Sequence, residues 1–258
     1  MAEINEPYKP EGKVFCGDGR EQELLRFVQN HPEFDSMRNN PARVLDAIDE
    51  YGHKKDFLMN VGKNKGATIS RIIEERTPGI MVELGGYIGY SAIMFADVLR
   101  KTGGKKYISL EINPEFASVA SSLISIAGLA DIVDIRVGPC ASSLRKLQEG
   151  DAGFQIDLLF LDHQKSAYVR DLMLCEKLFL IRSGSMIVAD NVISPGAPLY
   201  QEYVRGSQSE KERLRDLLAK NDEHLKALGN CSLEYTSKLL EGFEPTGERD
   251  GVEVSICH

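Results

Sequence analysis

The chain has 258 residues, 42% of them hydrophobic and 27% charged, a composition and length that allow one large α/β domain or two small ones. A formal net charge of -8 without a basic cluster argues against a nucleic-acid partner. Five cysteines without a Cys-x-x-Cys pair, and no run of about 18 apolar residues, predict a cytoplasmic protein with reduced thiols and no membrane partner.

The N-terminal part of the chain predicts a loose arm followed by helices. Residues 1–19 are rich in Pro, Gly and charge, which is typical of a flexible arm. Residues 20–76 are expected to be helical, because apolar residues recur there at helical spacing, at 21–30, 41–51 and 67–76. The loop before the last helix contains Met59 and Val61, which could cover a neighbouring cofactor; a plain helix–helix connection is the alternative.

Residues 80–91, IMVELGGYIGYS, predict a strand, a tight turn and a helix start. Glycines in the turn allow a sharp bend and a close approach of the backbone to a ligand. They do not follow the dinucleotide spacing Gly-x-Gly-x-x-Gly, and the strand carries the acid Glu83. A second acid, Glu111, ends the next predicted strand and could bind both ribose hydroxyls. An adenosyl sulfonium fits this pattern; an ordinary glycine-rich turn is the alternative.

The rest of the chain alternates predicted strands and helices. Strands are expected at residues 107–111, 133–137, 157–161 and 185–189, and helices at 90–100, 114–127, 168–179 and 207–228. Two closing strands are expected at residues 232–236 and 252–256. Such alternation predicts a parallel sheet with right-handed crossovers, so polar residues that follow successive strands gather at its carboxyl edge.

Polar side chains follow two of these strands. Asp162 comes after one strand, and Asp190 and Asn191 come after the next. Two carboxylates and an amide oxygen are hard donors that suit Mg²⁺, which keeps other coordination positions for water or substrate. Lys165 lies three residues beyond Asp162 and could act as general base on a chelated diol. Taken singly, strand-end acids are often turn residues and a lone lysine is often solvated.

Seven ordered motifs resemble the catechol O-methyltransferase family of class I S-adenosylmethionine-dependent enzymes. They span roughly residue 17 to the C-terminus and read MNVGKNKG (59–66), VELGGYIGYSA (82–92), LEINPE (110–115), FLDHQK (160–165), ADNVISPGAP (189–198), YVRGS (203–207) and LEY (233–235). The resemblance implies one α/β domain over residues 1–258, with a Rossmann-like three-layer fold and a seven-stranded, mostly parallel sheet whose last strand is antiparallel.

The resemblance also implies roles for individual residues. The S-adenosylmethionine site would comprise Met59, Val61, Glu83, Gly85, Tyr87, Ser91, Glu111, Ile112, Cys140, Ala141, Asp162 and His163. Mg²⁺ would be held by Asp162, Asp190 and Asn191, with Lys165 and Glu234 as catalytic residues. The substrate, a small catechol-type molecule, would contact Lys165, Asn191, Glu234, Phe57, Gln164 and Pro195.

Two departures from the family pattern bear on specificity. The chain has no Trp, and the two tryptophans that flank the family's substrate fall at Phe57 and Gln164. An aromatic wall that carries a glutamine predicts a bulkier or more polar acceptor. Cys140 and Ala141 replace a Ser-Gln pair beside the adenine.

Other functions stay open at this point. An O-methyltransferase for larger hydroxycinnamoyl or flavonoid diols is a close alternative. An NAD(P)-dependent dehydrogenase on a similar sheet is less consistent with the glycine spacing. A third possibility is a cofactor-binding protein without catalysis. We expect a monomer or weak dimer.

Overall fold

A single seven-stranded sheet forms the centre of the protein. The computed structural model describes residues 7–220, 225 and 227–258. The strands lie in the order β3-β2-β1-β4-β5-β7-β6, with β1 to β5 parallel and β7 antiparallel to both neighbours. Their bounds are β1 (Ile80–Leu84), β2 (Lys106–Glu111), β3 (Val133–Val137), β4 (Leu158–Leu161), β5 (Met186–Ala189), β6 (Tyr235–Phe243) and β7 (Arg249–Cys257). The predicted Rossmann-like α/β fold is confirmed.

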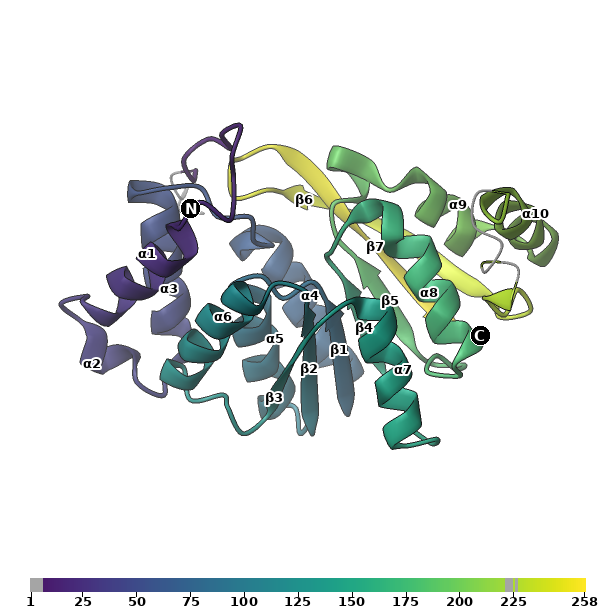
Figure 1. Ribbon diagram of the computed structural model, residues 1–258, viewed down its shortest axis with the longest axis horizontal. Coiled ribbons are helices and arrows are strands. Elements are labelled where there is room, and N and C mark those ends of the chain that lie inside the picture. The colour runs from purple at the N-terminus through teal and green to yellow at the C-terminus, as the bar shows by residue number, and fades with distance from the viewer. Residues whose placement is uncertain (1–6, 221–224, 226) are drawn as a thin grey trace.

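Helices cover both faces of this sheet. Figure 1 shows α1 to α6 on one side and α7 to α10 on the other. The helices are α1 (Arg20–Gln29), α2 (Phe34–Met37), α3 (Pro41–Lys54), α4 (Gly62–Arg76), α5 (Tyr90–Lys101), α6 (Pro114–Ile126), α7 (Cys140–Gly150), α8 (Tyr168–Lys177), α9 (Pro198–Arg205) and α10 (Gln208–Leu218), with short turns η1 (Lys165–Ala167) and η2 (Val192–Gly196).

Strand β4 shows how the three layers are held together. All four of its residues are buried. Leu158 and Phe160 pack into the core on the α1–α6 side, and Leu159 and Leu161 into the core on the other side. Successive side chains of a strand point to opposite faces, so a strand between two helical layers must be apolar throughout.

The described residues include elements that the sequence patterns did not indicate. Helices α2, α7 and α9 were not predicted, and α4 begins at Gly62, inside the stretch expected to be a loop. Strands β6 and β7 are each nine residues long and extend well beyond their predicted bounds. The predicted helix at 207–228 corresponds in part to α10; residues 221–224 and 226 lie outside the described residues.

The N-terminal segment contacts the hairpin that joins β6 and β7 near the C-terminus. Tyr8 is buried, its hydroxyl donates to Asp49, and its backbone N–H donates to Pro245 O at 2.9 Å. Pro245 lies at the tip of the β6–β7 hairpin, so this hairpin is fastened above the carboxyl edge of the sheet (Figure 1). None of the helices in the part of the chain that the structure describes has the length and apolar character needed to cross a bilayer.

Candidate active site

A cavity of about 830 Å³ opens at the carboxyl edge of the parallel strands. This is the edge at which doubly wound α/β sheets bind their ligands. Nearly all the predicted site residues line it: Phe57, Met59, Val61, Gly85, Tyr87, Ser91, Glu111, Ile112, Cys140, Ala141, Asp162, His163, Gln164, Lys165, Asp190, Asn191 and Pro195. Two predicted residues, Glu83 and Glu234, do not. One continuous cavity therefore joins the predicted cofactor, metal and substrate residues.

The turn after β1 requires glycine. Gly85 has a φ of +93°, and a Cβ there would lie 2.5 Å from the backbone oxygen of Asp162. A Cβ on Gly86 would lie 2.3 Å from Ser109 Oγ. Neither position has room for a side chain, so the backbone itself forms the cavity wall and its groups can approach a ligand closely.

Glu111 supports this turn from the neighbouring strand. Its Oε2 accepts hydrogen bonds from Gly86 N at 3.1 Å and Tyr87 N at 2.7 Å, and its Oε1 accepts one from Asn113 N at 2.8 Å. The carboxylate still lines the cavity. Glu111 thus shapes the glycine turn and also places an acid in the cavity wall.

Glu83 lies behind the cavity wall, which corrects the prediction that it contacts the cofactor. It is fully buried, and it accepts hydrogen bonds from the hydroxyls of Ser91 and, at 2.6 Å, Ser109. Burial raises the pKa of Glu83 to about 7, although the serine hydroxyls oppose the shift. Ser91 does line the cavity. The effect of Glu83 on a ligand therefore passes through Ser91.

The predicted adenine side contains a histidine, a thiol and an isoleucine. His163 Nε2 lies 2.9 Å from Asp171 Oδ2, and its ring stacks on Tyr168 with centroids 5.0 Å apart. Burial, with Asp171 and Glu111 nearby, raises the pKa of Cys140 to about 12, so its thiol is neutral. Ile112 is exposed at the cavity rim.

The predicted base and metal ligands come together at the ends of β4 and β5. Lys165 Nζ donates to Asp162 Oδ1 at 3.0 Å and to Tyr168 Oη at 2.9 Å. The Tyr168 hydroxyl donates to Leu161 O at 2.8 Å. The amine of Lys165 is therefore held beside the carboxylate at the end of β4.

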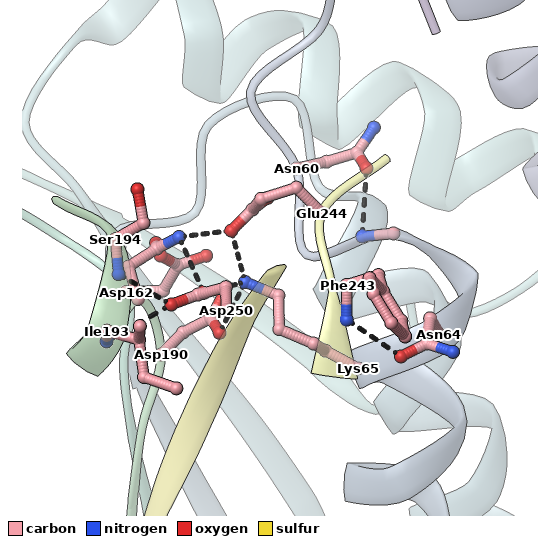
Figure 2. Close-up of polar contacts among 12 residues, drawn as sticks. Asn60, Asn64, Lys65, Asp162, Asp190, Ile193, Ser194, Phe243, Glu244 and Asp250 are labelled. Atoms are coloured by element: carbon pink, nitrogen blue, oxygen red, sulfur yellow. Dashed lines mark hydrogen bonds and ion pairs between the residues drawn. The ribbon is translucent and has the colours of Figure 1, made fainter. Parts of the chain in front are cut away.

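A buried ammonium lies behind these ligands (Figure 2). Lys65 Nζ lies 2.7 Å from Asp190 Oδ1, and it donates to Glu244 Oε1 and Asp250 Oδ2, each at 2.6 Å. Burial alone would lower the pKa of Lys65, but the charges of Asp190 and Glu244 raise it overall. Burial raises the pKa of Asp190 and also that of Glu244, the latter to about 8. Lys65 opposes both shifts.

Glu244, rather than Glu234, is the acid from the C-terminal strands that faces this site. Glu234 is exposed just before β6, and its backbone oxygen accepts a hydrogen bond from His258 N at 2.8 Å. Phe243 pairs with Arg249 at the other end of the same strand pair. Glu244 follows Phe243, lines the cavity and accepts a hydrogen bond from Asn191 Nδ2 at 2.5 Å. The prediction for Glu234 is therefore wrong, because the LEY motif lies at the opposite end of β6.

The oxygen donors fit a hard divalent cation. Asp162 Oδ1 faces Lys165 and Asp190 Oδ1 faces Lys65, while the amide nitrogen of Asn191 faces Glu244. Among the described residues, no hydrogen bond or ion pair uses Asp162 Oδ2, Asp190 Oδ2 or Asn191 Oδ1. When all groups are ionised, four carboxylates face two ammonium groups, a formal excess of two negative charges. Such a donor set and charge suit Mg²⁺.

Lys65, Asp250, Glu244 and Tyr168 were missed at the sequence level. The hairpin acids flank the turn PTGE (245–248), and β7 runs antiparallel to β5. That turn must therefore lie at the carboxyl edge of the parallel strands, a signal that could have located Glu244. No local pattern indicates Lys65, which is separated from its two hairpin partners by 179 and 185 residues.

Comparisons with known proteins identify the family of this chain. The sequence profile of the O-methyltransferase family matches residues 37–227. Catechol O-methyltransferase of Mus musculus is 38% identical over 201 residues, 78% of this chain and 74% of that protein. The Bos taurus catechol O-methyltransferase is 36% identical over 199 residues, 77% of this chain and 71% of that protein.

Solved structures of lower identity share the fold. The O-methyltransferase of Bacillus cereus, in complex with SAH, has a TM-score of 0.57 and 20% identity, with 95% of this chain and 94% of that chain covered. TomG of Streptomyces achromogenes, in complex with SAM, has a TM-score of 0.58 and 22% identity, with 92% and 96% covered. The chain belongs to the O-methyltransferase family, and it is a methyltransferase of the catechol O-methyltransferase type.

Proposed function

We propose that this protein transfers the methyl group of S-adenosylmethionine to one hydroxyl of a catechol-type diol, with Mg²⁺ bound by Asp162, Asp190 and Asn191. The observation that carries the proposal is the position of Lys165, whose amine lies 3.0 Å from Asp162 Oδ1 inside the cavity that Asp190 and Asn191 also line. A base beside a hard-oxygen cation site is the arrangement that deprotonation of a chelated hydroxyl requires.

The cofactor half of the cavity would bind a nucleoside without phosphates. Glu111, Ile112 and His163 line this half of the cavity. We expect Glu111 to contact the ribose, and Ile112 and His163 to flank the base. Ser91, held by Glu83, lies at the N-terminal end of α5, where a carboxylate is stabilised by backbone N–H groups and the helix dipole. S-adenosylmethionine supplies an electrophilic methyl group; in the transfer, its S–C bond breaks as the O–C bond to the acceptor forms.

The acceptor half would orient the diol and remove one proton. In its neutral amine form, Lys165 accepts the proton of the hydroxyl that becomes methylated, and the Glu244 carboxyl group forms a hydrogen bond with the second hydroxyl. A bound Mg²⁺ supplies positive charge that lowers the pKa of a neighbouring hydroxyl. Phe57 and Pro195 form apolar walls of the cavity. Alignment of two held reactants can contribute about 7 to 11 kcal/mol to the lowering of the barrier.

The proposed acceptor is a small catechol, and larger diols are the second candidate. Gln164 stands in the cavity wall, and Glu11, Phe15 and Thr246 extend the lining toward the arm and the hairpin. A wall with polar side chains leaves room for an acceptor with polar substituents beyond its ring, as in hydroxycinnamoyl or flavonoid catechols. The family membership favours a methyltransferase over the dehydrogenase and over a binding protein without catalysis.

Transfer of labelled methyl from S-adenosylmethionine to a set of phenols tests the proposal. Catechol and a hydroxycinnamoyl catechol should accept methyl, whereas phenol and resorcinol should react poorly, because neither can place two adjacent oxygens on one cation. Equal rates with phenol and catechol would contradict a diol-binding site.

All five cysteines are free thiols, which supports the proposal of a cytoplasmic enzyme. Gel filtration checks the expected monomer or weak dimer.

A further inference from the structure

Lys65 is a buried cation that three separate elements share. Its side chain, on α4, is 1% exposed. It reaches Asp190 at the end of β5, Glu244 after β6 and Asp250 at the start of β7, with nitrogen–oxygen distances of 2.6 to 2.7 Å. Figure 2 shows its ammonium at the centre of these carboxylates. In the chain segments that the structure describes, these contacts join the N-terminal helical layer to the C-terminal hairpin.

Each carboxylate holds a different part of the acceptor site. Asp250 Oδ1 accepts hydrogen bonds from Ile193 N at 3.2 Å and Ser194 N at 2.9 Å, so it fixes the chain that follows β5. Glu244 Oε1 accepts a hydrogen bond from Asn191 Nδ2 at 2.5 Å, and Asp250 Oδ2 accepts another from the same nitrogen at 3.2 Å. The orientation of the Asn191 amide thus depends on the two acids that Lys65 draws together.

Without the Lys65 ammonium, these carboxylates would repel one another. Asp190 is 2% exposed and Asp250 fully buried, so like charges would repel each other at short distance with little screening by water. The neighbouring contact between α4 and the hairpin is neutral: Asn64 Oδ1 accepts a hydrogen bond from Phe243 N at 3.0 Å. Lys65 therefore provides the charge, and Asn64 only a backbone contact.

We propose that Lys65 is a positioning residue, whose buried ammonium fastens the β6–β7 hairpin and the chain after β5 to the end of β5 and so presents Asp190, Asn191 and Glu244 to the acceptor before any cation binds. The proposal has two consequences. The first, order of the hairpin in the metal-free protein, follows from the contacts alone. The second, higher affinity for Mg²⁺, rests on the proposed function.

Lys65→Met is the direct test, and Lys54→Met is its control. Lys54, on α3, contacts one carboxylate, Glu50, at 2.8 Å, and the two side chains are 67% and 32% exposed. Removal of a partner from a half-exposed ion pair has little effect, whereas removal from a buried one is costly. Any difference between the two variants therefore reports on the buried cluster.

Amide hydrogen exchange of the metal-free protein gives the first readout. Lys65→Met should accelerate exchange by about tenfold or more in peptides that cover residues 241–250 and 191–197, because loss of a buried ion-pair partner exceeds the 1.4 kcal/mol that tenfold represents. Peptides from α8 should exchange as in the wild type, and Lys54→Met should change neither region. Unchanged exchange in both segments of Lys65→Met would overturn the proposal, whatever the metal does.

Calorimetric titration with Mg²⁺ alone gives the second readout. Lys65→Met should weaken Mg²⁺ binding by about tenfold or more, while the affinity for S-adenosylhomocysteine stays within about twofold, since the ion pairs of Lys65 go to Asp190, Glu244 and Asp250 and not to the glycine turn. Equal Mg²⁺ affinity in wild type and variant would overturn the positioning role. A wild type that binds no Mg²⁺ would instead refute the proposed metal site, and exchange of the hairpin would still decide the role of Lys65.

A second variant covers the case in which Lys65→Met does not fold. The double substitution Lys65→Met with Asp250→Asn removes one charge of each sign, and the amide oxygen of the new side chain can still accept the backbone hydrogen bonds of the chain after β5. Residues 241–250 should exchange faster than in the wild type, because Glu244 has still lost its cation, while 193–194 stay protected. Wild-type exchange in the hairpin of this variant would overturn the proposal.

Discussion

The Nζ atom of Lys165 lies 3.0 Å from Asp162 Oδ1, so the proposed base and a proposed metal ligand are already paired in the ligand-free protein. The side chains are 19% and 18% exposed, which leaves both within reach of a substrate. The pair places the proton acceptor beside the position at which a cation would acidify a hydroxyl.

Replacement of this lysine should remove the base and leave the cofactor site intact. For Lys165→Met we expect kcat to fall by about 10² to 10⁴, the usual contribution of a general base. Binding of S-adenosylhomocysteine should persist, because the substitution leaves the glycine turn after β1 and Glu111 at the end of β2 unchanged. Steady-state kinetics and calorimetry measure the two quantities. Lys177→Met, on the exposed side of α8, is the control, and a kcat equal to that of the wild type in Lys165→Met would exclude the base.

The hydroxyl of Tyr168 should position Lys165. It accepts a hydrogen bond from Lys165 Nζ and donates one to Leu161 O, and its ring packs edge-on against Tyr200 at 5.7 Å. Tyr168→Phe keeps the ring and should lower both kcat, by about tenfold, and stability, by about 1 to 2 kcal/mol.

Tyr200→Phe provides a matched control for that change. The Tyr200 hydroxyl is buried and has no hydrogen-bond partner among the described residues, so its removal should leave kcat unchanged and stability equal or higher. Chemical denaturation and steady-state kinetics of both variants decide the point. Identical losses in the two variants would show that the Tyr168 effect is one of packing only.

The assignment of Glu244, in place of Glu234, as the acid that contacts the methyl acceptor can be tested directly. Glu244→Gln should weaken the interaction with the second hydroxyl and raise KM for a catechol by about tenfold, the value of one hydrogen bond to a charged group. Glu234→Gln should have no effect, since its side chain is exposed at the far end of β6. A loss of activity in Glu234→Gln alone would restore the interpretation based on the LEY motif.

Glu83 should make stability depend on pH. Its folded-state pKa, about 7, is above the unfolded value of 4.5. The folded protein therefore keeps a proton between pH 4.5 and 7 that the unfolded chain releases, and the free energy of unfolding falls as the pH rises through this window. The shift corresponds to about 3 kcal/mol. This stabilisation is fully present below pH 4.5 and lost above pH 7.

Denaturation of wild type and Glu83→Gln at several pH values measures this contribution. The difference in unfolding free energy between them should change by about 3 kcal/mol from pH 4.5 to pH 8, with the wild type relatively weaker at high pH. Glu75→Gln, at an exposed position of α4, should show a constant difference. A constant difference in Glu83→Gln as well would contradict the raised pKa.

Local patterns were sufficient for one half of the site. Each of Asp162, Asp190 and Asn191 follows a short buried strand directly, and parallel strands that end at one edge bring such residues together without further information. The glycines of the turn after β1 are equally local, because their backbone conformation and the lack of space for a Cβ leave no other residue type.

The other half depends on contacts between distant segments. Glu244 reaches the site only through the register of the nine-residue strands β6 and β7, and a motif match at the wrong end of β6 moved the prediction to Glu234. Lys65 was hidden because a lysine in a polar helix start resembles a solvated one, and only the packing of α4 against the hairpin buries it. Glu83 was predicted to contact the cofactor because it is an acid at the end of β1. Its carboxylate instead accepts a hydrogen bond from the Ser91 hydroxyl.

The most direct test of the metal-dependent account is methyl transfer to catechol by protein stripped of divalent cations with EDTA. The account predicts that transfer falls to background in the chelator and returns when Mg²⁺ is added in excess, and that Asp162→Asn and Asp190→Asn require far more Mg²⁺ for the same rate. Full transfer in EDTA, with S-adenosylmethionine still bound, would contradict it.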